Sequence, residues 1–234
     1  MYNFSIEVCK NNCDNFGIKN LELCDGYFGA PLADMSPAQL EDARVSLIKS
    51  LSRVVLYTAH TPVSQYESYV KFFRNAHLIG AENVKLAYSA VEGASEDEIR
   101  RVIAIAEAFS IKVLFELEAE NIEKFGFEQY AAVRSDATGL IFNPNEFVKL
   151  HKNPFLSVLY KTKYKDDVVI LRVCDMLYDS CHPALPEKGN SEIKECASSL
   201  LSRSFKGYFS FGKYGEDISV SEVIDAFANA LCNM

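Results

Sequence analysis

The feature of this sequence that most constrains its fold is the alternation of short apolar runs with longer amphipathic segments along the chain. The apolar runs are rich in Val, Ile, Leu, Phe and Tyr and are nearly continuous, which is typical of strands covered on both faces of a parallel sheet. The runs predict seven strands, at Lys19–Leu23, Arg53–Thr58, Asn83–Ala87, Lys112–Leu117, Gly139–Phe142, Val168–Val173 and Gly207–Phe211.

The segments between these runs predict helices, among them Tyr66–Leu78 and Glu98–Phe109, whose apolar residues recur at helical spacing. Several segments open with a serine followed three residues later by Gln or Glu, the pattern of a capping box. Strands that alternate with capped helices indicate a parallel sheet with helices packed on it. The four predicted capping boxes begin at Ser36, Ser64, Ser95 and Ser219.

The β/α alternation runs nearly from end to end, and no linker rich in Gly, Ser or Pro divides the chain, so we expect residues 1–234 to form a single domain. An eighth strand would have to be Tyr2–Ser5, ahead of a helix around Ile6–Phe16. Eight β/α units close a TIM barrel, whereas fewer leave an open sheet. We therefore predict an α/β protein with a (β/α)8 TIM barrel, in which the first β/α unit is short.

Composition and charge exclude several classes of function. The chain has 24 Lys and Arg residues against 32 Asp and Glu residues, a formal net charge of −8. Such a chain lacks the positive charge that phosphate contacts need, so we expect no nucleic-acid partner and no membrane partner. No apolar run approaches the roughly 18 residues of a membrane span, no secretory signal is visible, and the cysteines show no C-x-x-C spacing. We expect a cytoplasmic protein, and the oligomeric state stays open.

Common catalytic and nucleotide-binding motifs are absent. The sequence has no G-x-G-x-x-G after a strand, no P-loop, no G-x-S-x-G and no H-E-x-x-H. Its four histidines lie far apart. These absences argue against a dinucleotide-binding fold, a P-loop enzyme and an α/β-hydrolase, but ligands gathered from several strand ends would escape such a search.

Six segments resemble, in the same order, the strands of one known group of proteins. Gly17–Leu23 looks like its Gly-x-x-x-hydrophobic-Glu-Leu strand, and Ala76–Val84 looks like its A-x-x-L-G-A-x-x-V passage. On these segments the chain resembles the sugar phosphate isomerase/epimerase superfamily, which includes barrels similar to xylose isomerase and endonuclease IV. The resemblance covers residues 17–212 and implies a xylose isomerase-like barrel. The remaining segments that carry it are Ile111–Glu116, Gly139–Asn145, Ile170–Asp175 and Phe205–Ser210.

The resemblance also implies a metal site, which this chain has altered. Enzymes of the superfamily hold a divalent cation with Glu, Asp, His and Glu at the ends of strands five to eight, and the cation polarises a carbonyl while carboxylates move a proton. Glu116 matches the first position, whereas Asn143, Arg172 and Gly212 stand where Asp, His and Glu are expected; Glu216 is the alternative to Gly212. Arginine cannot ligate and glycine has no side chain. We therefore expect a degenerate site with no cofactor, or with weak binding of Mn²⁺ or Mg²⁺.

The candidate site residues follow from their positions at strand ends. Glu116 is the catalytic candidate, although it could also belong to an exposed run of alternating acids over 116–120. A loop hydrogen bond is the alternative for His60, and contacts with the loop backbone are the alternative for Asp175. The substrate-binding candidates are Glu22, His60, Asn143, Arg172 and Asp175.

Arg172 carries a separate prediction because it is a charged residue inside an apolar strand. A buried guanidinium without a partner would cost several kcal/mol. We predict that its side chain points into the barrel mouth and meets Glu116, Asp175 or Asn143, where its charge would replace that of a cation.

Three functions remain after these arguments. The resemblance implies an isomerase or epimerase that acts on a small sugar or hydroxy-carbonyl compound, although three of the four expected ligands are replaced. The alternative is a catalytically inactive, metal-free barrel that serves as a binding or regulatory protein. Cleavage of phosphodiesters, as in endonuclease IV, would need many His and carboxylate ligands and a basic face, which this acidic chain lacks. Fold analogy alone does not decide among them.

Overall fold

A computed structural model describes residues 3–7, 17–212, 215 and 217–233. The chain divides into two compact units, which are described separately below. No helix in these described ranges is both long enough and apolar enough to cross a membrane. Unit 1 consists of Met1–Phe16, Leu117–Glu120 and Leu140–Met234, and unit 2 consists of Gly17–Glu116 and Asn121–Gly139.

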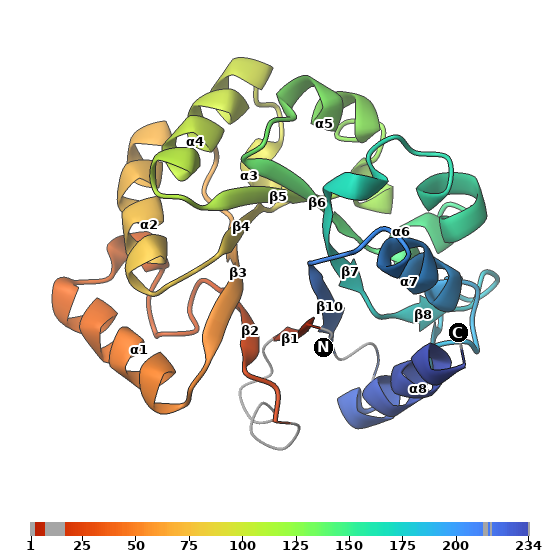
Figure 1. The fold of residues 1–234 in the computed structure, drawn as a ribbon. Helices are drawn as coiled ribbons and strands as arrows, with labels where there is room; N and C mark the ends of the chain where they lie inside the picture. The colour runs from red at the N-terminus through yellow and green to blue at the C-terminus, as the bar shows by residue number, and fades with distance from the viewer. Residues whose placement is uncertain (1–2, 8–16, 213–214, 216, 234) are drawn as a thin grey trace. The chain divides into compact units, whose positions relative to one another are not determined.

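Unit 2 is built on four parallel strands. They are β2 (Asn20–Cys24), β3 (Arg53–Ala59), β4 (Asn83–Leu86) and β5 (Lys112–Glu116), and each pairs with the next. Figure 1 shows the helices of this unit outside the strands. The helices are α1 (Pro37–Lys49), α2 (Tyr66–Leu78), α3 (Tyr88–Val91), α4 (Glu96–Ala108) and α5 (Phe127–Val133).

Aromatic side chains hold α2 and α5 on one face of the unit 2 strands. The ring of Tyr57 on β3 lies 5.7 Å from that of Phe72 on α2. On β5, Phe115 stacks on Phe125 at 5.2 Å and meets Tyr130 of α5 edge to face at 6.1 Å. Because successive strand residues point to opposite faces, the neighbours of Tyr57 and Phe115 along each strand face away from the helices.

Unit 1 contains a second parallel set. β1 (Asn3–Glu7) pairs with β10 (Tyr208–Phe211), β10 with β7 (Val168–Arg172), and β7 with β6 (Thr138–Phe142), which belongs to this unit from Leu140 onward. The other elements of the unit are α6 (Pro144–Val148), α7 (Ile193–Leu201), α8 (Val220–Cys232) and the antiparallel pair β8 (Asp175–Met176) and β9 (Pro183–Ala184). Short helical turns in this unit are η3 (Pro154–Leu159) and η4 (Lys165–Asp167), whereas η1 (Leu32–Asp34) belongs to unit 2 and η2 (Ala119–Asn121) ends at the first residue of a unit 2 segment.

The observed strands confirm the predicted fold class. All seven predicted strands are present, and each begins and ends within one residue of its expected bounds. The strand orders β5-β4-β3-β2 in unit 2 and β1-β10-β7-β6 in unit 1 are those of a (β/α)8 TIM barrel. The eighth strand is β1, which continues to Glu7, so the prediction of a helix from Ile6 is wrong at its first two residues. The rest of that predicted helix, residues 8–16, lies outside the described residues.

Three of the four predicted capping boxes are confirmed. In each, the serine hydroxyl accepts a hydrogen bond from the backbone N–H three residues later, and the Gln or Glu side chain at that position accepts one from the serine N–H. These boxes satisfy backbone donors that the first turn of a helix leaves unpaired. They begin at Ser36, Ser95 and Ser219.

The capping box predicted at Ser64 is wrong. Helix α2 begins at Tyr66, and its N-cap is Gln65, whose side chain makes no capping hydrogen bond. The backbone N–H of Gln65 instead donates to the carbonyl oxygen of Pro62 at 2.9 Å, which closes a turn just before the helix. This turn puts Gln65 instead of Ser64 at the N-cap, whereas the bounds of the helix are those predicted.

Close packing of β7 against the residue before β10 gives the first prediction. A Cβ atom at Gly207 would lie 1.9 Å from the carbonyl oxygen of Val169, which is backbone and cannot swing aside. We expect Gly207→Ala to lower the free energy of unfolding by about 3 kcal/mol, the upper range for overpacking. Chemical denaturation measures this change.

Gly80→Ala is the matched control. Gly80 has a φ of 76° and nothing within 4 Å of its would-be Cβ, so only backbone strain of about 1–2 kcal/mol applies. Equal losses in the two variants would contradict the packing described at Gly207.

Candidate functional site

A lysine and a glutamate form a largely buried ion pair at the carboxyl ends of two neighbouring strands of unit 2. The Nζ atom of Lys85, the third residue of β4, donates to Oε2 of Glu116, the last residue of β5, at 2.6 Å. The Lys85 side chain is 15% exposed and that of Glu116 is 7% exposed. Glu116 is therefore not part of an exposed acidic run, which was the alternative interpretation of this residue.

The pair lies on the strand face opposite the helices. Thr58 pairs in register with Lys85, and both lie on the face away from Tyr57, as does Glu116. Glu22 is 4% exposed and lies on the same face, because it pairs with a residue two positions before Thr58. We call this the inner face of unit 2, since in a TIM barrel that side of the strands lines the interior. The carboxyl ends of the strands are where TIM-barrel enzymes place their catalytic groups.

Lys85 was not among the residues predicted from the sequence. Its strand is otherwise apolar apart from Asn83, so the argument that singled out Arg172 applies to it equally. A charged residue at the carboxyl end of a buried strand needs a partner there, and Glu116 supplies one.

Arg172 lies in a comparable position in unit 1. It is 4% exposed, and its Nη1 atom donates to the hydroxyl oxygen of Ser210 at 2.8 Å. Phe209 and Phe211, on either side of Ser210, both contact Phe227 of α8, at 5.1 and 5.8 Å between ring centroids. Ser210 and its register partner Arg172 therefore lie on the face opposite α8. The predicted contact of Arg172 with Glu116, Asp175 or Asn143 stays a prediction.

Asn143 follows β6 and caps the next helix. Its Oδ1 atom accepts hydrogen bonds from the backbone N–H of Asn145, at 3.2 Å, and from the thiol of Cys174, at 3.2 Å. An N-cap asparagine with Pro144 directly after it is a common way to begin a helix. The side chain of Asn143 thus has a structural role at α6, and substrate binding by it stays a prediction.

Asp175 holds a long loop together. Its carboxylate accepts hydrogen bonds from the backbone N–H groups of Met176 and Ser191, at 2.8 and 2.9 Å, and of Gly189, at 2.9 Å. Burial raises the pKa of Asp175, and the hydrogen bonds from Ser191, Gly189 and Met176 oppose that rise. Asp175 therefore binds the loop backbone, which was the alternative stated for it in the sequence analysis. Contact of Asp175 with substrate stays a prediction.

The structure thus groups some of the predicted site residues within each unit. Glu22 and Glu116 share the inner face of unit 2, and His60 follows β3 as an exposed residue. Asn143 and Arg172 lie at the carboxyl ends of β6 and β7 in unit 1.

The side chains at the positions that the resemblance assigns to a metal offer few ligand atoms, and a degenerate metal site stays a prediction. The carboxylate of Glu116 binds the Lys85 ammonium, Asn143 offers a neutral amide, and Arg172 cannot ligate. Gly212 has no side chain, and its alternative, Glu216, lies outside the described residues. Within the described ranges, no three His, Cys, Asp or Glu side chains are grouped as metal ligands. The weak metal binding expected from the sequence stays a prediction.

The Lys85–Glu116 pair gives a stability prediction. Removing one partner of a buried ion pair typically costs about 3–5 kcal/mol, because the other charge remains buried. We expect Lys85→Met and Glu116→Gln each to lower the free energy of unfolding in this range, and the double variant to lose much less than the sum. A double-mutant cycle by chemical denaturation measures the coupling.

The exposed pair Arg53–Glu82 is the control for this cycle. It joins the first residue of β3 to the residue before β4, at the amino ends of these strands, and the side chains of Arg53 and Glu82 are 67% and 30% exposed. Exposed pairs contribute about 0.2–1 kcal/mol. A coupling for Lys85 and Glu116 no larger than that of the control pair would contradict the buried pair.

The contacts of Asp175 give a second prediction. Asp175→Ala leaves buried backbone N–H groups without acceptors, and we expect it to lower the free energy of unfolding by about 2–3 kcal/mol. Amide hydrogen exchange at Gly189 and Ser191 should accelerate. Asp179→Ala, an exposed position in the same loop, should change neither quantity.

Comparison with known proteins bears on the fold. No protein-family model matches the chain, and no curated protein matches its sequence significantly. Solved structures do match. A xylose isomerase domain protein from Planctomyces limnophilus has a TM-score of 0.72 and 10% identity, over 99% of this chain and 96% of that chain. D-psicose 3-epimerase from Clostridium cellulolyticum, solved with D-tagatose, has a TM-score of 0.70 and 12% identity, over 99% of both chains.

A third match is endonuclease IV from Thermus thermophilus, with a TM-score of 0.67 and 14% identity, over 100% of this chain and 99% of that chain. At such low identities these likenesses show the fold, and the reaction has to be argued from the side chains. The strand order and these matches together show that the chain has the xylose isomerase-like TIM-barrel fold.

Proposed function

We propose that this protein is an isomerase or epimerase of a small sugar or other hydroxy-carbonyl compound and that it works without a divalent cation. One observation carries the proposal: a positive and a negative side chain, Lys85 and Glu116, meet at 2.6 Å at the carboxyl ends of β4 and β5. Sugar epimerases are among the solved structures that share this fold. In TIM barrels these strand ends carry the catalytic groups.

The two side chains offer a base and a positive charge for proton transfer next to a carbonyl. The Glu116 carboxylate would accept a proton from the carbon that bears a hydroxyl, as a general base. The Lys85 ammonium would stabilise the negative charge that develops on the carbonyl oxygen, the task that a cation performs in the related enzymes. Return of the proton to the neighbouring carbon, with transfer of the hydroxyl proton to the former carbonyl oxygen, completes an aldose–ketose isomerisation. Delivery of a proton to the opposite face of the same carbon by a second acidic group completes an epimerisation.

The low exposure of the pair supports this assignment. Electrostatic stabilisation is stronger where water is excluded, and the side chains of Lys85 and Glu116 are only 15% and 7% exposed. The roles of Glu22, His60, Asn143, Arg172 and Asp175 as substrate contacts are part of the same proposal.

The proposal also covers the class of ligand and the location of the protein. A net charge of −8 supports a small-molecule ligand over a nucleic acid or an anionic membrane surface. A cytoplasmic location is part of the same proposal.

Deuterium exchange tests the proposed reaction. The protein is incubated in D₂O with a panel of aldoses, ketoses and their phosphates, and NMR follows the loss of the proton on the carbon next to the carbonyl. We expect enzyme-dependent exchange with at least one compound, a fall of at least 100-fold in Glu116→Gln, since general base catalysis contributes about 10²–10⁴-fold, and a similar fall in Lys85→Met. Glu82→Gln, in the exposed pair, should exchange at the rate of the unchanged protein.

Metal dependence separates this proposal from its rivals. Added Mn²⁺ should leave the exchange rate unchanged, and calorimetric titration should show no tight binding. A submicromolar Mn²⁺ affinity that disappears in Glu116→Ala would overturn the metal-free mechanism. Stabilisation by a sugar without any exchange would favour the alternative, a metal-free barrel that binds its ligand for regulation.

A further inference from the structure

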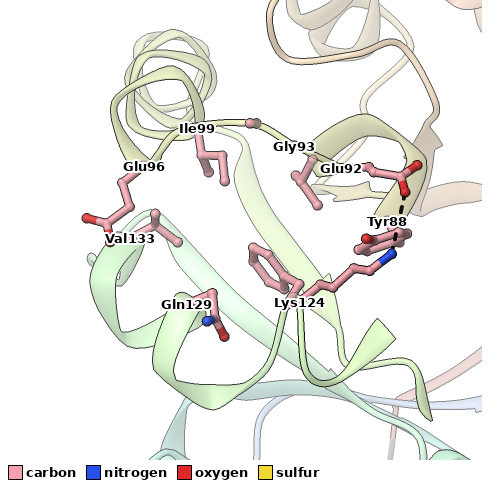
Figure 2. Close-up of a pocket in the computed structure, with 11 residues that line it drawn as sticks. Tyr88, Glu92, Gly93, Glu96, Ile99, Lys124, Gln129 and Val133 are labelled. Carbon is pink, nitrogen blue, oxygen red and sulfur yellow. Dashed lines mark ion pairs between the residues drawn. The ribbon is translucent and has the colours of Figure 1, made fainter. Parts of the chain in front are cut away.

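A cavity opens between the loops that follow β4 and β5 in unit 2, and neither Lys85 nor Glu116 lines it. Its volume is about 450 Å³, within the range of small-molecule sites. The floor is apolar: it contains Val91, Ile99, Phe125 and Val133, each at most 7% exposed. Figure 2 shows Ile99 and Val133 among the side chains that line this cavity.

The rim of the cavity is charged, and the chain itself places an ammonium group there. Nζ of Lys124 lies 4.0 Å from a carboxylate oxygen of Glu92, and the two side chains are 69% and 59% exposed. Figure 2 shows the Lys124 side chain reaching Glu92 alongside Tyr88. An exposed pair at this distance contributes little to stability, so Lys124 can leave Glu92 at small cost.

The second carboxylate on the rim is already engaged. Glu96 receives a hydrogen bond from Arg100 one helical turn later, at 3.3 Å. Glu92 is therefore the carboxylate whose present partner is the most easily displaced.

We propose that this cavity binds a small free primary amine with an apolar tail. The ligand ammonium takes the place of the Lys124 ammonium at Glu92, beside the ring of Tyr88, where a cation is also attracted to the aromatic face. The tail covers the floor of Ile99, Phe125 and Val133 and is removed from water there.

Calorimetric titration with a series of amines tests the proposal. The probes are butylamine, hexylamine and octylamine, compared with hexanol and hexanoate at neutral pH and low salt. We expect affinity to rise about fourfold for each methylene that the floor buries. Hexylamine should bind several times more tightly than hexanol, by the amount that one carboxylate and one aromatic ring add at an exposed site.

Three variants of rim residues test the role of each charge in amine binding. Glu92→Gln should remove the preference for hexylamine over hexanol. Lys124→Met removes the competing ammonium and should strengthen hexylamine binding a fewfold. Glu96→Gln is the matched control, a rim carboxylate already paired within α4, and should leave the affinity unchanged.

Several outcomes would overturn the assignment. Equal affinities for hexylamine and hexanol, or indifference to Glu92→Gln, would remove the role of the rim carboxylate. Tightest binding of hexanoate, lost in Lys124→Met, would make the ligand an anion. Tighter binding of an Nα-acetyl-lysine amide than of hexylamine would assign the site to a lysine of another polypeptide. NMR shifts confined to residues other than Val91, Ile99 and Val133 would place the amine elsewhere.

Discussion

Burial of the central strands on both faces is the constraint on which the rest of this structure depends. Their backbone groups are satisfied by the parallel ladders, so a charged side chain on such a strand has to find its partner nearby. Lys85 meets Glu116 on the neighbouring strand, and Arg172 donates to Ser210, its register partner. The opposite faces carry aromatic residues that bind the helices, such as Phe115 on β5. The alternation of side chains along each strand thus puts the aromatic residues that bind the helices on one face and the charged residues on the other.

Much of the fold could be predicted because its signals are local. Each strand is a nearly continuous apolar run, which is recognisable without knowing its neighbours. The capping boxes at Ser36, Ser95 and Ser219 involve only residues three apart. The box expected at Ser64 failed because a turn closed by Gln65 precedes that helix, and Gln65 takes the N-cap position instead of Ser64. The hairpin of β8 and β9 has two residues in each strand, too few for any periodicity.

The candidate site was harder to predict because its contacts are distant in the sequence. Glu116 was identified through a resemblance, but its partner Lys85 lies 31 residues earlier, and no local pattern joins the two. A signal for Lys85 did exist, the same one that drew attention to Arg172: a charge within an apolar strand. The contacts of Asp175 come from Gly189 and Ser191, backbone donors 14 and 16 residues later. Only a folded loop reveals such donors, because every residue except proline carries one.

The position of Lys85 has a consequence for how the positive charge beside Glu116 depends on the metal ions around the protein. A divalent ion in a carboxylate and imidazole site must be acquired after synthesis, and sites of this kind bind copper and zinc more tightly than manganese or magnesium, so a wrong ion can occupy them. The ammonium of Lys85 is part of the chain and arrives at Glu116 with the folding of β4 and β5. A positive charge held in this way is present in every copy of the protein, and neither scarcity of one metal nor excess of another alters it.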